Sequence, residues 1–127
     1  MAGERILVVD DNPVNQRLTR VLLSGEGYDV RCAEDAAEAF AMLAEFRPRL
    51  ILMDLQLPGL DGLEATRRLK ADPATRGILV VALTAYAMRG DDEKARAAGC
   101  DGYLSKPIDT RRFPGVIASY LAGRQGA

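Results

Sequence analysis

Five short apolar runs alternate along the chain with longer segments in which apolar residues recur at helical spacing. The strand-like runs cover residues 5–10, 28–33, 50–54, 78–84 and 102–105. The intervening patterns predict helices over about 13–24, 36–46, 63–70, 88–98 and 110–122. Strict alternation of apolar strands with helices predicts an α/β fold, in which helices cover both faces of a parallel five-stranded sheet.

The first helix has the clearest boundaries. Asn12 is suited to the N-cap and Pro13 to the first helical position, while Gly25 and Gly27 stop the helix. Four apolar residues recur at helical spacing between them, namely Val14, Leu18, Val21 and Leu22.

The last helix carries a proline near its start. A proline inside a helix loses a hydrogen bond and clashes with the preceding turn. We therefore predict that the helix proper starts near Pro114, after a looser turn from Asp109 to Phe113.

Composition narrows the class of protein. The chain has 127 residues, 48% of them hydrophobic and 28% charged, with a formal net charge of −1. These values predict one globular domain over 1–127, with a core of about 5–122 and a frayed tail at 123–127. No basic block indicates a direct nucleic-acid partner, and no apolar run approaches the roughly 18 residues needed to cross a bilayer. We expect a cytoplasmic protein without membrane insertion.

The sequence contains no histidine, which excludes histidine-based catalytic triads and histidine zinc ligands. It contains two cysteines, Cys32 and Cys100. In a doubly wound sheet of order 2-1-3-4-5 they would lie near opposite edges, roughly 19 Å apart by strand spacing. That separation predicts that no disulfide joins them.

Polar residues follow four of the strands, at the point where each strand ends. Asp10 and Asp11 follow the first, Asp54 the third, Thr84 the fourth and Lys106 the fifth. In the order 2-1-3-4-5 the switch point lies between the first and third strands, so the three acids should face one crevice. Thr84 would lie one strand away, and Lys106 would reach back from two strands away.

This set of side chains suits phosphoryl chemistry. Clustered carboxylates need a positive charge among them, and Mg²⁺ (or Mn²⁺) prefers such oxygen ligands. A carboxylate can also attack phosphorus. Asp54 is central, so it is the expected nucleophile, with Thr84 and Lys106 contacting phosphoryl oxygens.

Four segments, VVDDNPVNQ, LILMDLQLPGLDG, VVALTAYA and GYLSKPID, together resemble the receiver domain of two-component response regulators, which has a CheY-like, flavodoxin-like (βα)5 fold. The resemblance covers about residues 5–121. It implies that Asp54 accepts the phosphoryl group, and that Asp10 and Asp11 form the acidic metal pair. It also implies that Gln56 lends a backbone carbonyl to the metal.

The resemblance assigns further residues. Thr84 and Lys106 match the hydroxyl and lysine of the family pattern, and the Lys106–Pro107 bond matches a cis peptide. Tyr103 matches an aromatic switch position. Gln56 and Tyr86 match positions that influence how water reaches the acyl phosphate, and we hypothesise that Tyr86 prolongs its lifetime.

The implied function is phosphoryl signalling. The donor would be a phosphohistidine on a sensor histidine kinase or a histidine phosphotransfer protein. Movement of Thr84 and inward rotation of Tyr103 would then reshape the surface of the fourth helix, fifth strand and fifth helix for an unknown downstream protein. The chain would slowly hydrolyse its own aspartyl phosphate without being a turnover enzyme.

Other interpretations stay open. The domain could bind proteins without phosphorylation, or act as an aspartyl-nucleophile phosphatase resembling haloacid dehalogenases, although its second acid comes one position early for D-x-D. A flavin mononucleotide carrier is a weaker match, because acids after the first strand would repel the phosphate.

The single residues also have structural interpretations: Asp10 and Asp11 could cap a helix, Thr84 could end a strand, and Tyr103 could pack at a sheet edge. Met1 and the short leader give a small preference to a free-standing regulator over a piece of a hybrid kinase.

Overall fold

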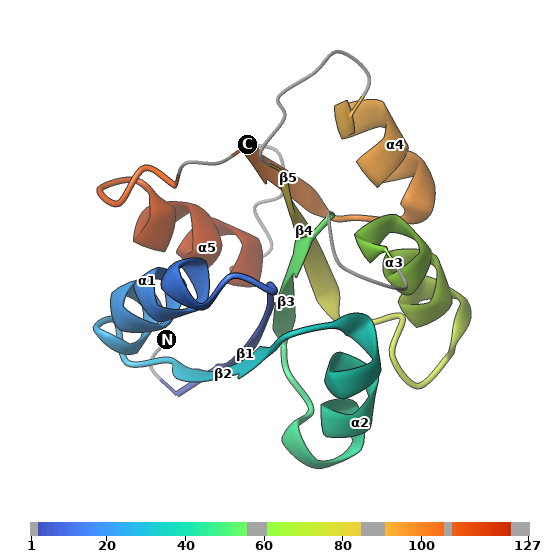
Figure 1. The fold of residues 1–127 in the computed structure, drawn as a ribbon, viewed down its shortest axis with the longest axis horizontal. Coiled ribbons are helices and arrows are strands. Elements are labelled where there is room, and N and C mark those ends of the chain that lie inside the picture. The colour runs from blue at the N-terminus through green and yellow to red at the C-terminus, as the bar shows by residue number, and fades with distance from the viewer. Residues whose placement is uncertain (1–2, 56–60, 85–90, 106–107, 123–127) are drawn as a thin grey trace.

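The computed structural model describes residues 3–55, 61–84, 91–105 and 108–122, with the side chains of 91 and 92 excepted. These residues form one parallel sheet of order β2-β1-β3-β4-β5 with five helices (Figure 1). The strands are β1 (Arg5–Val9), β2 (Asp29–Ala33), β3 (Leu50–Asp54), β4 (Leu79–Thr84) and β5 (Gly102–Ser105). The helices are α1 (Pro13–Ser24), α2 (Ala36–Phe46), α3 (Gly62–Ala71), α4 (Asp91–Ala98) and α5 (Phe113–Leu121). The predicted fold class and strand order are confirmed.

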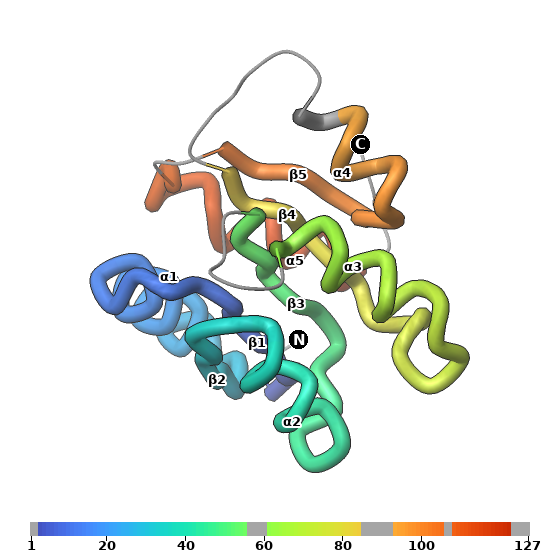
Figure 2. Tube along the Cα trace, turned by 45° about the vertical axis from the view of Figure 1, so that its right-hand side comes forward, coloured from blue at the N-terminus to red at the C-terminus, as the bar shows by residue number. Residues whose placement is uncertain are grey.

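Helices cover both faces of the sheet, with α1 and α5 on one side and α2, α3 and α4 on the other (Figures 1 and 2). Because neighbouring residues of a strand point to opposite faces, each central strand supplies both layers of the core. In β1, Ile6 and Val8 join the cluster under α1 and α5, while Leu7 and Val9 join the cluster under α2 and α3. All four are fully buried. This two-sided burial explains why the central strands are continuous apolar runs.

The helix α1 has the predicted ends, but its apolar stripe does not face the core, as such a stripe usually does. Asn12 caps it, since its side-chain oxygen accepts the backbone N–H groups of Val14 and Asn15 at 2.8 and 3.3 Å. Three of its four periodic apolar residues are nevertheless exposed, with exposed fractions of 74% for Val14, 37% for Leu18 and 62% for Val21. The residues that α1 buries are Thr19 and Leu23. Helical spacing therefore predicted the element correctly, but the apolar stripe does not mark its packed side.

The irregular start of α5 is confirmed. The helix begins at Phe113, with Pro114 in its first turn, where no backbone N–H is needed. Before it, the backbone N–H groups of Arg112 and Phe113 both donate to the carbonyl of Asp109 in a tight turn. For α4, the predicted start at residue 88 lies outside the described residues.

Both cysteines are free, as predicted. Cys32 lies on β2 and Cys100 precedes β5, at the two edges of the sheet. Burial raises the pKa of both thiols. Among the helices of the described ranges, none has both the length and the apolar character that crossing a bilayer demands.

Arg47 ends α2 in the left-handed conformation, with φ of +50°. A side chain is strained there, whereas glycine is not. We expect Arg47→Gly to raise the free energy of unfolding by about 0.5 to 1 kcal/mol. Urea unfolding followed by circular dichroism measures it. Arg20→Gly, inside α1, should instead cost about 1 kcal/mol, and a loss of stability in both variants would contradict the strain argument.

Candidate functional site

Three carboxylates meet at the carboxyl edge of the sheet. Asp10 follows β1, Asp11 comes next, and Asp54 is the last residue of β3. One carboxylate oxygen from each residue lies within 4.8 Å of the other two. Asp10 and Asp54 are buried, with 1% and 3% of their surface exposed, while Asp11 is exposed. Their positions at the ends of neighbouring strands predicted this proximity.

The backbone around Asp10 is held from three directions. Its N–H donates to the carbonyl of Ala33 at 3.0 Å, and its Oδ1 accepts the N–H of Asn12 at 2.9 Å. The side-chain amide of Gln16 donates to the carbonyls of Asp10 and Ala33. The role of Gln16 is not visible in the sequence, because it depends on a contact between α1 and the end of β2. These bonds fix the entry into α1 and thereby the direction of the acidic pair.

Asp54 and Thr84 end neighbouring strands. Asp54 lies opposite Leu83 in the parallel register, and the N–H of Leu55 donates to the carbonyl of Leu83 at 2.9 Å. Thr84 is the next residue and is buried, with 2% exposed. The hydroxyl residue therefore lies one strand away from the acid, at the same edge of the sheet.

Tyr103 lies on the same face of the sheet as Thr84. Tyr103 is opposite Ala82, and Thr84 is opposite Ser105. Val80 lies in the cluster under α2 and α3, and residues two apart on a strand share a face, so the side chains of Thr84 and Tyr103 point to that side of the sheet. Tyr103 is half-buried on the edge strand β5. This placement suits both a packing aromatic and a switch, so the role of Tyr103 stays a prediction.

Four predicted residues lie outside the described residues: Gln56, Tyr86, Lys106 and Pro107. Their assignments therefore stay predictions from the sequence.

The three acids fit a small divalent cation. With metal–oxygen bonds of about 2.1 Å, two ligands of Mg²⁺ lie about 3 Å apart when adjacent and about 4.2 Å apart when opposite. Both separations fall inside the 4.8 Å limit within which the three carboxylate oxygens lie. All three donors are hard oxygens, and exposed Asp11 leaves a path from solvent. Two of the carboxylates are buried side by side, an arrangement that is costly unless positive charge lies among them.

The chain belongs to the response regulator receiver domain family, whose model matches residues 6–118. Members of this family are signalling modules of two-component systems rather than turnover enzymes, and they interact with histidine kinases or phosphotransfer proteins.

Two relatives illustrate the similarity. The chain is 47% identical over 116 residues to the polar-differentiation response regulator DivK of Brucella anthropi, a match that covers 91% of this chain and 94% of that protein. It is 38% identical to the receiver domain of sensor histidine kinase PA1611 from Pseudomonas aeruginosa, with a TM-score of 0.85. That match covers 95% of this chain and 99% of the other, whose structure is described with a magnesium ion coordinated in the active site cleft.

A second similar structure is a CheY-like receiver domain protein from Methanospirillum hungatei. It is 29% identical, with a TM-score of 0.87 and coverage of 97% of both chains. The likeness thus extends over nearly the whole chain.

Proposed function

We propose that this chain is a phosphoacceptor signalling domain that receives a phosphoryl group on Asp54. The observation that carries the proposal is the cluster of Asp10, Asp11 and Asp54 beside buried Thr84, all at one edge of the sheet. The family membership supports it. In this proposal residues 5–122 form the signalling core.

The transfer forms a bond between an Asp54 carboxylate oxygen and phosphorus while the phosphorus–nitrogen bond of a phosphohistidine breaks. The electron pair of that bond returns to the donor imidazole. Asp10, Asp11 and Asp54, with the backbone carbonyl of Gln56, would hold Mg²⁺ (or Mn²⁺), which when bound neutralises charge between acid and phosphoryl group. Thr84 donates its hydroxyl to a phosphoryl oxygen, and Lys106 supplies a positive charge to another.

Signal output follows from the same residues. Thr84 and Tyr103 share a face of the sheet, so inward movement of the hydroxyl frees space for the aromatic ring. The surface formed by α4, β5 and α5 then changes for a downstream protein. The acyl phosphate decays by hydrolysis, at a rate that Gln56 and Tyr86 adjust.

The phosphodonor would dock on α1. This helix begins shortly after the acidic pair, and its exposed stripe of Val14, Leu18 and Val21 lies outside both buried clusters of the core. Such a stripe matches a helical partner that brings its phosphohistidine to the acids. The proposal therefore separates the donor surface, on α1, from the output surface beside β5.

Charged substitutions on α1 test this docking. Val14→Asp with Val21→Asp should leave modification by acetyl phosphate unchanged, because both side chains are exposed and neither residue belongs to the acidic cluster. Transfer from a purified, phosphorylated histidine phosphotransfer domain should slow at least tenfold, since burying two new charges opposes association. Rapid-quench transfer rates measure both. Ala41→Asp, at an exposed position of α2, is the matched control, and equal slowing in that variant would refute an α1 surface.

The direct test of phosphoryl acceptance is treatment of the purified chain with acetyl phosphate and Mg²⁺, followed by intact mass. We expect one added phosphoryl group, and none when EDTA removes the metal. Absence of the adduct under saturating conditions would favour a protein-binding module that works without phosphorylation. Sustained turnover of p-nitrophenyl phosphate would instead favour the phosphatase interpretation.

A further inference from the structure

The start of α3 lies directly against the backbone of Asp54. Asp61 caps the helix by accepting the N–H of Glu64 at 2.8 Å, and Gly62 is its first residue. A Cβ added at Gly62 would lie 2.3 Å from the carbonyl oxygen of Asp54 and 2.9 Å from Cα of Leu55. Both distances are shorter than any ordinary contact between such atoms, so only a residue without a side chain allows this approach.

The neighbouring atoms at Gly62 belong to the backbone, which makes the contact hard to relieve. At Gly102 an added Cβ would come equally close, 2.3 Å, to Cζ of Tyr120. There the neighbour is the outer end of a half-buried side chain, which can rotate away. At Gly62 either α3 or the Asp54–Leu55 peptide would have to move.

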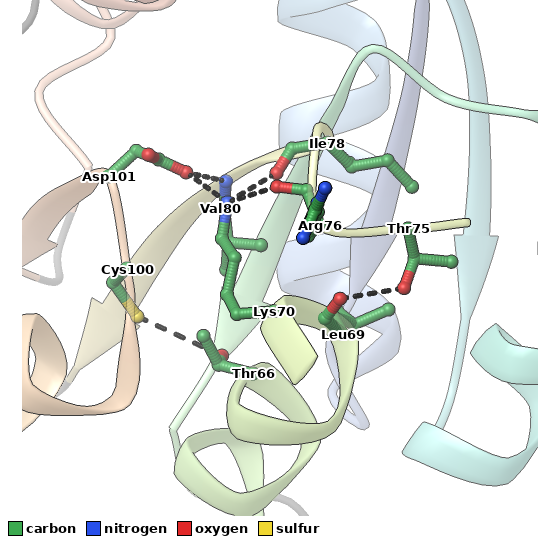
Figure 3. Close-up of polar contacts among 9 residues, drawn as sticks. All are labelled: Thr66, Leu69, Lys70, Thr75, Arg76, Ile78, Val80, Cys100 and Asp101. Carbon is green, nitrogen blue, oxygen red and sulfur yellow. Dashed lines mark hydrogen bonds and ion pairs between the residues drawn. The ribbon is translucent and has the colours of Figure 1, made fainter. Parts of the chain in front are cut away.

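The helix α3 is fixed along its length and at its far end. Ala65 and Leu69 are buried against the sheet. At the far end the ammonium of Lys70 donates three hydrogen bonds (Figure 3). Its acceptors are the carbonyls of Arg76 and Ile78, at 3.2 and 2.7 Å, and Oδ2 of Asp101, at 2.8 Å.

The ion pair between Lys70 and Asp101, which anchors the far end of α3, connects that helix to two strands. Asp101 Oδ2 also accepts the N–H of Val80 at 2.9 Å, so the ion pair joins α3 to the start of β4 and the entry to β5. The stem of Lys70 passes beneath Gly99, where an added Cβ would lie 2.8 Å from Cγ of Lys70. With α3 held in this way, a side chain at residue 62 would displace the Asp54–Leu55 peptide rather than the helix.

From these contacts we infer that Gly62 is a positioning residue: the close contact of α3 with the Asp54 carbonyl sets where the Asp54 carboxylate lies relative to Asp10 and Asp11. This inference rests on the proposed metal site. Its consequence is that the metal affinity depends on a residue that has no side chain and touches no metal.

The test compares two alanine substitutions of equal steric size. Gly62→Ala should weaken Mg²⁺ binding at least tenfold by calorimetric titration, and should move the amide resonances of Asp54 and Leu55 in the metal-free protein. Gly102→Ala should leave the Mg²⁺ affinity within twofold of wild type. Gly115→Ala, in the first turn of α5 with nothing within 4 Å, controls for helix propensity.

A second variant tests whether the contacts of Lys70 hold α3 in place. Lys70→Met frees the far end of α3, so combining it with Gly62→Ala should restore part of the lost Mg²⁺ affinity, while Lys70→Met alone leaves affinity unchanged. Trimethylamine N-oxide, added to all proteins alike, keeps a destabilised variant folded for the titration.

Unchanged Mg²⁺ affinity in Gly62→Ala would overturn the inference. So would equal weakening in Gly62→Ala and Gly102→Ala. A wild type that binds Mg²⁺ but gains no phosphoryl group would defeat the proposed function alone.

Discussion

The Asp54→Asn variant is expected to gain no phosphoryl group from acetyl phosphate and Mg²⁺ under conditions that modify the wild type fully. The amide of asparagine is a far weaker nucleophile than a carboxylate and carries no charge for the metal. Asp54 is buried at the end of β3, and it is the acid of the cluster whose strand lies next to that of Thr84. Intact mass after a fixed reaction time gives the result directly.

The matched control is Asp29→Asn, which removes one exposed carboxylate at the start of β2. It should be modified as fast as wild type. Peptide mapping of the wild-type adduct should find the modification in the segment that contains Asp54. An adduct of the same size on Asp54→Asn would place the acceptor elsewhere and remove the basis of the proposed function.

Replacing both Asp10 and Asp11 with asparagine should have two opposite effects. Mg²⁺ affinity should fall at least 100-fold, because each lost carboxylate is worth about tenfold, or about 1.4 kcal/mol. The metal-free protein should become more stable by about 1 kcal/mol, since two of three crowded negative charges are gone. The asparagine that replaces Asp10 keeps a side-chain oxygen to accept the N–H of Asn12, so the loop geometry should survive.

Calorimetric titration measures the first effect and thermal unfolding in EDTA measures the second. A charge-matched control, Glu26→Gln with Asp29→Asn, neutralises two acids near the opposite end of the sheet and should alter neither quantity appreciably. If the metal-free variant were less stable than wild type, the acids would be acting mainly as structural acceptors. The cluster would then be part of the scaffold rather than a site.

The sequence was sufficient to predict the order of elements and the meeting point of the acids. Buried parallel strands need apolar residues on both faces, and that requirement is visible in runs such as 50–54. A fixed strand order then places Asp10 and Asp54 at one edge. These predictions depend on the local hydrophobic pattern and on the order of the strands, and both can be inferred from short segments of the sequence.

What the sequence could not predict depends on contacts between distant segments. The exposed stripe of α1 has the same spacing as a buried one, so only the packing of Thr19 and Leu23 distinguishes them. The contact of Gly62 with Asp54 and the anchor of Lys70 on Asp101 join parts of the chain that no periodicity links.

The exposed residues of the α1 stripe contribute little to the stability of the fold, and this has an evolutionary consequence. A mutation at Val14 or Val21 costs little folding energy, because these two side chains are largely exposed, at 74% and 62%. If the phosphodonor docks on α1 as proposed, duplicated copies of such a gene could diverge in which kinase they respond to while retaining the same phosphoryl-transfer residues. A few surface substitutions would then be enough to keep two related signalling pathways from exchanging phosphoryl groups. Each protein along this evolutionary route would stay folded and active.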